Sequence, residues 1–179
     1  MELLCLDFMN SDVRDYLGGG RRTDRLRDPE WLAGFLSRWG LGDPGAPGRA
    51  VSADLQALRS AMWRVVEANV EERAAGDEDL AALDAVLAAA PLRRRLVRDG
   101  SGVQVRFEPA KRDWAWIASE VAASFADLLA AHDSHRLKLC GNPDCRWVFY
   151  DESKNRTRRW CADSCGNLIK VRRFRKARR

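Results

Sequence analysis

Four of the five cysteines lie within 26 residues, and their spacing constrains this chain more than any other feature. Cys140 and Cys145 form a C-x4-C pair, and Cys161 and Cys165 form a C-x3-C pair. A tetrahedral Zn²⁺ site needs four such thiolates at about 2.3 Å, and the four together leave no coordination position open. Two disulfides would instead need an oxidising compartment, and the sequence shows no export signal. We therefore predict one structural zinc ion held by these cysteines.

The residues around the cysteines predict the shape of a zinc finger. Gly141–Pro143 can turn the chain sharply, so that both thiols of the first pair point at one atom. Trp147–Tyr150 fits a strand, and Cys161 and Cys165 can share one face of the first turn of a helix. The order of knuckle, strand, loop and helix indicates a treble-clef-like finger. Three aromatic residues are expected to pack against the knuckles, with stacking on bases as the alternative: Trp147, Phe149 and Trp160.

Charge divides the chain at about residue 135. Residues 136–179 contain 14 Lys/Arg and 4 Asp/Glu, a net charge of +10, whereas residues 1–135 carry −5. Zinc with four deprotonated thiols lowers the first value to about +8. A basic module on an acidic body is typical of a protein that binds a polyanion. We expect residues 1–135 to form one domain and residues 136–179 a second, smaller one.

The basic residues lie on the loop between the cysteine pairs and on the helix predicted after them. Those expected to contact nucleic acid are Lys154, Arg156, Arg158, Arg159, Lys170, Arg172, Arg173, Arg175 and Lys176. A basic helix fits the major groove of DNA, where lysine and arginine meet phosphates first. DNA is the favoured partner. The alternatives are RNA as the partner, a solvated basic tail, or a finger that is a protein-interaction module or a purely structural clamp on the helical body.

The first 135 residues predict a mostly helical α+β body with a small antiparallel sheet. Helices are expected after Asp28, from Ser52, after Gly76 and from Asp113 to His132. Residues 92–107 alternate around a turn signal and predict a hairpin with one solvated face. The apolar opening at residues 3–9 fits a helix or a strand equally well. No apolar run approaches the length of a membrane span, so we expect a cytoplasmic protein.

Asp7 and Asn10 are polar residues within the apolar opening. Their residue types predict capping or a backbone hydrogen bond. The sequence contains no legible nucleophile–base pair or phosphate loop, so we expect no enzymatic activity. Cys5 is expected in the core and His135 is not needed as a zinc ligand. A homodimer is compatible with these features.

Two stretches resemble known families. Asp151–Cys161, followed by Cys165-Gly166-Asn167, resembles the CGNR-type zinc finger, and Leu6–Ser11 is similar to the opening of the ABATE domain that precedes this finger in bacterial proteins. The resemblance implies a bacterial, stress-linked transcription regulator with a nucleic-acid-binding finger and a ligand-sensing N-terminal domain. It also implies a ligand pocket in that domain, with Asp7 and Asn10 as its candidate binding residues. Leu168 departs from the motif, which has arginine at this position. The contact of that arginine is expected to be absent or supplied by a neighbour.

Overall fold

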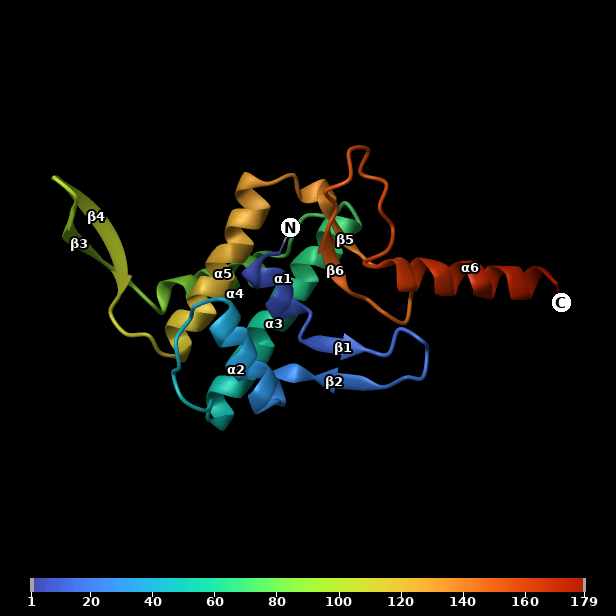
Figure 1. Cartoon of the computed structure of the whole chain (residues 1–179), viewed down its shortest axis with the longest axis horizontal. Helices are drawn as coiled ribbons and strands as arrows, with labels where there is room; N and C mark the ends of the chain where they lie inside the picture. The colour runs from blue at the N-terminus through green and yellow to red at the C-terminus, as the bar shows by residue number, and fades with distance from the viewer. Residues whose placement is uncertain (1, 179) are drawn as a thin grey trace.

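The computed structural model describes residues 2–178 and confirms a mostly helical α+β fold (Figure 1). The helices are α1 (Leu4–Met9), α2 (Pro29–Arg38), α3 (Arg49–Val70), α4 (Asp77–Ala88), α5 (Trp114–Ala131) and α6 (Asp163–Ala177), with single 3-10 turns η1 (Arg25–Arg27) and η2 (Ser134–Arg136). The strands are β1 (Asp12–Arg14), β2 (Arg22–Asp24), β3 (Leu92–Asp99), β4 (Gly102–Pro109), β5 (Leu137–Leu139) and β6 (Val148–Tyr150). Within residues 2–178 the strands form three separate two-stranded antiparallel sheets, β1–β2, β3–β4 and β5–β6.

Local capping chemistry explains where the helices begin. The Asp28 carboxylate accepts from the backbone N–H of Glu30 at 3.0 Å and so begins α2, as predicted. The prediction that Ser52 begins α3 is wrong, because the helix begins at Arg49. The Ser52 hydroxyl instead donates to the carbonyl of Gly48, already one turn into the helix. A serine near a helix start can therefore bond backwards within the first turn as well as cap it.

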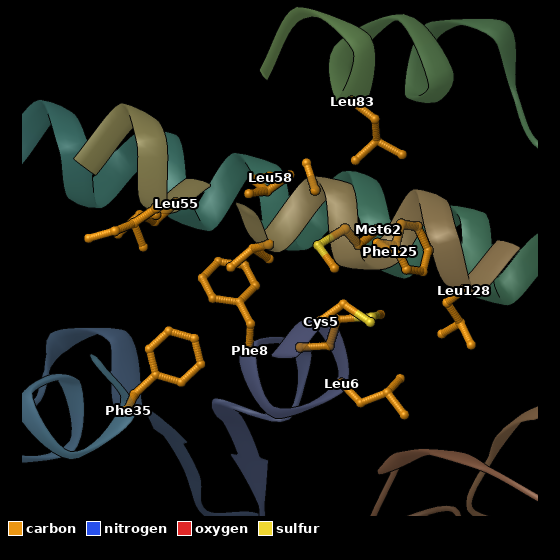
Figure 2. Close-up of a cluster of buried hydrophobic side chains, with 14 of the residues drawn as sticks. Cys5, Leu6, Phe8, Phe35, Leu55, Leu58, Met62, Leu83, Phe125 and Leu128 are labelled. Carbon is orange, nitrogen blue, oxygen red and sulfur yellow. The ribbon is translucent and has the colours of Figure 1, made fainter. Parts of the chain in front are cut away.

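The apolar opening is a helix, α1, rather than a strand, and the core surrounds it (Figure 2). Cys5 and Phe8 are almost fully buried, and Cys5 is a core residue as predicted. Side chains from α2, α3, α4 and α5 converge on them: Phe35, Leu55, Leu58, Met62, Leu83, Phe125 and Leu128. Burial of these apolar side chains drives the packing of the helices.

The zinc-binding segment packs on this same core. Leu137 of β5 and Val148 of β6 are each 1 % exposed and belong to the core cluster of the body. Asn10 follows α1, and its side-chain amide bonds both backbone groups of Val148: Oδ1 accepts from the N–H and Nδ2 donates to the carbonyl, each at 2.9 Å. The cysteine-rich segment is therefore held against the body by apolar contact and by a two-point hydrogen bond.

The β3–β4 hairpin stands away from the helices, at the end of the molecule opposite α6 (Figure 1). Its register pairs Leu96 with Val105 and Arg94 with Phe107. Every residue of both strands is exposed or half-buried, so the prediction of a single solvated face is wrong. The predicted alternation is present, but no helix of the described chain lies over the apolar face. Among residues 2–178, no helix is both long and apolar enough to span a membrane.

Candidate metal centre and nucleic-acid interface

The four predicted cysteine ligands converge on one point. The sulfurs of Cys140, Cys145, Cys161 and Cys165 all lie within 4.8 Å of one another. The Sγ–Sγ distances are 3.7 Å between Cys145 and Cys161 and 3.9 Å between Cys161 and Cys165. A regular tetrahedron with zinc–sulfur bonds of about 2.3 Å has sulfurs about 3.8 Å apart. The thiols are therefore positioned to hold one structural zinc ion.

Two local structures present the sulfurs. The first pair lies on the connection between β5 and β6, where the backbone N–H of Cys140 donates to the carbonyl of Trp147 at 2.8 Å. The second pair lies at the start of α6. Cys165 is in its first turn, whereas Cys161 precedes the helix, which begins at Asp163. The prediction that both lie in one helical turn is therefore correct for Cys165 and wrong for Cys161. The resulting order of knuckle, strand, loop and helix is that of the predicted finger.

Asn142 supports the metal site from the first knuckle. Its side chain is fully buried, and Nδ2 lies 3.7 Å from the sulfur of Cys165. The same nitrogen donates to the carbonyl of Tyr16 at 2.9 Å, which ties the knuckle to the turn between β1 and β2. An N–H directed at a ligand sulfur stabilises the thiolate and orients it. The sequence predicted only a turn residue at Asn142, because Tyr16 lies far away in the chain.

Trp160 lies between the two glycines that follow ligand cysteines. A Cβ on Gly141 would lie 3.0 Å from the indole of Trp160, and a Cβ on Gly166 would lie 2.9 Å from it. Both glycines therefore make room for this ring, rather than only bringing helix and knuckle together. Trp147 and Trp160 pack on the cysteine cluster as predicted, whereas Phe149 is buried beneath Arg158.

The crowding of the sulfurs explains why the site needs a cation. A hydrogen bond from Cys161 lowers the pKa of Cys145 to about 6. The same hydrogen bond raises the pKa of Cys161, and burial raises the pKa of Cys165 to about 11. Sulfurs this close cannot all ionise unless a positive charge lies between them. Binding of zinc is therefore coupled to release of protons.

Asp151 organises the loop that carries much of the basic charge. Its carboxylate is fully buried and accepts from Lys138 at 2.6 Å and from the backbone N–H of Ser153 and Arg158 at 2.9 and 3.0 Å. Burial alone would raise the pKa of Asp151, but these hydrogen bonds outweigh burial and hold it well below its usual range. This role was not predicted. The signal for it is an aspartate directly after a strand, at the start of a polar loop.

The predicted nucleic-acid contacts divide into two groups. Eight of the nine are exposed, and Arg172 is half-buried. Five have side chains with no hydrogen bond, ion pair or ring contact within residues 2–178: Lys154, Lys170, Arg173, Arg175 and Lys176. The others contact the protein itself. Arg156 pairs with Asp133 at 2.7 Å and Arg158 donates to the carbonyl of Trp160 at 2.9 Å.

The two remaining arginines also have partners within the chain. Arg159 lies 5.7 Å from the centre of the Trp160 ring. Arg172 pairs with Asp144 at 2.6 Å and donates to the carbonyl of Leu17 at 2.8 Å, so it faces the β1–β2 turn. Leu168, where the motif has arginine, is half-buried one helical turn before Arg172. The face of α6 that carries Arg172 is therefore turned towards the body, and the end of the helix extends beyond it (Figure 1).

Asp7 and Asn10, the predicted ligand residues, both line a pocket of about 420 Å³ between the body and the finger. Asp7 accepts from Arg38 and from the indole N–H of Trp39, each at 2.8 Å. The amide of Asn10 is engaged with Val148. A larger, mainly apolar cleft of about 960 Å³ lies elsewhere, along α2 and the loop that follows it. That cleft was not predicted from the sequence, because one of its walls is the irregular loop between α2 and α3.

Comparison with protein families accounts for both parts of the chain. Residues 2–132 match the ABATE family, described as "putative stress-induced transcription regulator". Residues 136–179 match the CGNR zinc finger. Comparison with curated proteins gives no match. The order of the two parts is the one that the sequence motifs indicated, and the first covers well over half of the chain. The chain therefore belongs to the ABATE family, in the form that carries a C-terminal CGNR zinc finger.

Proposed function

We propose that this protein is a zinc-dependent transcription regulator that binds nucleic acid, with duplex DNA favoured, through α6 and the loop after β6. One observation carries the proposal. α6 begins at a zinc ligand and then extends beyond the body with Lys170, Arg173, Arg175 and Lys176 exposed. No acidic residue follows Asp163 in the sequence. A rigid basic helix of this size matches the width of the major groove.

The zinc site supports a binding role rather than a catalytic one. Four thiolates complete a tetrahedral coordination sphere, so a water molecule cannot be activated at the metal. The role of zinc is then to hold the loop and the start of α6 in one geometry. All five cysteines are free thiols, which agrees with a reducing, cytoplasmic location.

Fluorescence anisotropy with labelled duplex DNA, at a series of salt concentrations, tests the proposal. Replacing Arg173, Arg175 and Lys176 by alanine is expected to weaken binding and to reduce the slope of log K against log salt by about 0.9 for each phosphate that the helix no longer neutralises. The matched control replaces Arg93, Arg95 and Arg106, which lie on one face of the distant hairpin and remove the same charge. Equal reductions in affinity for the two variants would show only a general charge effect and would contradict the proposed surface.

The same assay separates the two alternative functions. Structured RNA that binds more tightly than duplex DNA under identical salt would favour an RNA-binding protein. Binding to neither at low salt would favour a finger that only stabilises the body. Leu137 and Val148 of the finger pack in the core of the body, so in this second alternative the finger stabilises the body through these two side chains.

We further infer that a small molecule sensed in the pocket containing Asp7 and Asn10 would act on the finger. The walls of that pocket come from both parts, since Trp39 belongs to the body and Trp147 to the finger. A ligand there is expected to change tryptophan emission of the zinc-loaded protein. Screening of metabolite mixtures by thermal shift, with a Trp39→Ala variant as control, tests the idea. Stabilisation that is unchanged in the variant would direct attention to the larger cleft.

A further inference from the structure

The β3–β4 hairpin carries an apolar face that nothing in residues 2–178 covers. The pairing register places on one face Leu92, Leu96, Val103, Val105 and Phe107, which are 51 %, 75 %, 66 %, 54 % and 59 % exposed. An isolated two-stranded hairpin is marginally stable in water, and needs a further strand or a helix against its apolar face. We therefore expect another protein surface to cover the exposed apolar face of this hairpin.

The charges on this face exclude simple stacking of two hairpins. Within residues 92–109, all of which the structure describes, the charged members of the apolar face are Arg94 and Arg98. Arg94 lies with its guanidinium 5.7 Å from the ring centre of Phe107. Two such faces packed on each other would bring four arginines together without a carboxylate. A suitable partner surface is apolar and carries acidic residues.

The same chain presents such a surface on α4. Glu78 is exposed on this helix and shares its face with Ala82 and Ala85, at four and seven residues further on. A groove of about 460 Å³ runs along the same helix, between α3, α4 and the start of α5. Its lining is largely small and apolar, and includes Val51, Ala57, Ala82, Ala85, Val86 and Trp114. Asp54 also lines the groove, and the basic Arg64 there is already paired with Asp79.

We propose that two copies of this chain form a symmetric dimer in which the hairpin of each copy packs on α4 and the adjoining groove of the other. The exchange is isologous, because the hairpin of each subunit contacts the same groove of the other. Arg94 and Arg98 then face the carboxylates beside the groove, those of the partner's Asp54 and the partner's Glu78. Both α6 helices remain free, because α6 lies at the other end of the molecule (Figure 1). The dimer does not depend on whether the finger binds nucleic acid.

The area is sufficient for a stable dimer. Each exposed apolar side chain of the hairpin offers on the order of 100 Å² of surface, so one hairpin buries about 500 Å². Two hairpins with the two surfaces that receive them bury about 2,000 Å² in total, which is within the range of specific interfaces. An eight-residue strand spans roughly 27 Å, long enough to reach along a twelve-residue helix of about 18 Å.

Sedimentation equilibrium of the zinc-loaded full chain tests the dimer. The expected mass is twice the 20.2 kDa of one chain. Leu96→Glu is expected to give a monomer, because it places a charge in the apolar face of the hairpin. Gln104→Glu, on the opposite face of the same hairpin, is the matched control and is expected to remain dimeric. Leu96 is largely exposed in the single chain, so its replacement leaves the fold of the subunit intact; unchanged circular dichroism checks this.

Charge reversal identifies the surface that receives the hairpin. Arg94→Glu with Arg98→Glu, and separately Asp54→Lys with Glu78→Lys at the groove, are each expected to raise the dimer Kd at least about tenfold. Mixing the two variants restores a heterodimer, because each half of the interface then pairs opposite charges. A wild-type monomer at about 100 µM, a dimer that survives Leu96→Glu, or a mixture that stays monomeric overturns the proposal. Hairpin variants that stay monomeric and bind nucleic acid more weakly than the groove variants would assign the hairpin to nucleic acid instead.

Discussion

Replacing Asn10 by alanine removes the two-point hydrogen bond that joins the finger to the body. The side chain is 5 % exposed, and both of its bonds to Val148 are 2.9 Å long. Alanine leaves one buried N–H and one buried carbonyl without a partner, and each such group costs about 1–3 kcal/mol. We expect a decrease in the free energy of unfolding of about 3–4 kcal/mol, a large part of the roughly 5–15 kcal/mol typical of a folded domain.

Urea unfolding of the zinc-loaded protein measures this decrease. Helix content followed by circular dichroism and tryptophan emission are expected to change together, because body and finger share a core. The midpoint of thermal unfolding is expected to fall by on the order of 10 °C. Two control variants are expected to lose less stability than Asn10→Ala. Asn69→Ala removes one side-chain bond, to the carbonyl of Ser134 at 2.8 Å, and is expected to cost about 1 kcal/mol. Asn155→Ala changes an exposed loop residue and is expected to cost almost nothing.

The ordering of the three variants is the decisive result. Asn10→Ala must be the most destabilising, followed by Asn69→Ala and then Asn155→Ala. If the free energy of unfolding of Asn10→Ala is within about 1 kcal/mol of the wild-type value, then water or a shift of β6 supplies new hydrogen bonds to the backbone N–H and carbonyl of Val148. Separate transitions for helix content and tryptophan emission in the wild-type protein would show that finger and body fold independently, and would equally refute a stabilising role for this hydrogen bond.

Further predictions concern the metal site and the loop. Chelation under reducing conditions is expected to release one zinc ion per chain, to unfold the segment from residue 140 and to lower the stability of the body; retention of the native spectrum would contradict the coupling. Gly166→Ala is expected to weaken zinc binding in competition titrations, because the added methyl meets the ring of Trp160 at 2.9 Å, whereas alanine at exposed Gly48 gives no change in zinc affinity. Asp151→Asn breaks the buried pair with Lys138 and is expected to cost about 3 kcal/mol. Because the pKa of Asp151 is depressed in the folded protein, its stabilising contribution is complete above about pH 5 and declines as pH falls further. The variant and the wild type should thus differ less in stability at about pH 3 than at about pH 7; an unchanged difference would contradict the assignment.

Several features could be predicted from the sequence because their signals are local. Two close pairs of cysteines dictate a four-sulfur site, since the pairs need only a turn and the start of a helix to point at one ion. Asp28 predicts the start of α2 through a bond that spans two residues. The alternation at residues 92–107 predicts a hairpin because residues on one face repeat with a period of two.

The tertiary structure decided everything that depends on partners distant in the chain. Asn10 meets Val148 across 138 residues, and Asn142 meets Tyr16 across 126, so neither role has a signal in its own neighbourhood. Arg172 is identical in chemistry to Arg173, yet one contacts the body and the other faces solvent. The sequence likewise could not show that the apolar face of the β3–β4 hairpin stays uncovered. A period of two shows which residues share a face, but only packing determines whether another element covers that face.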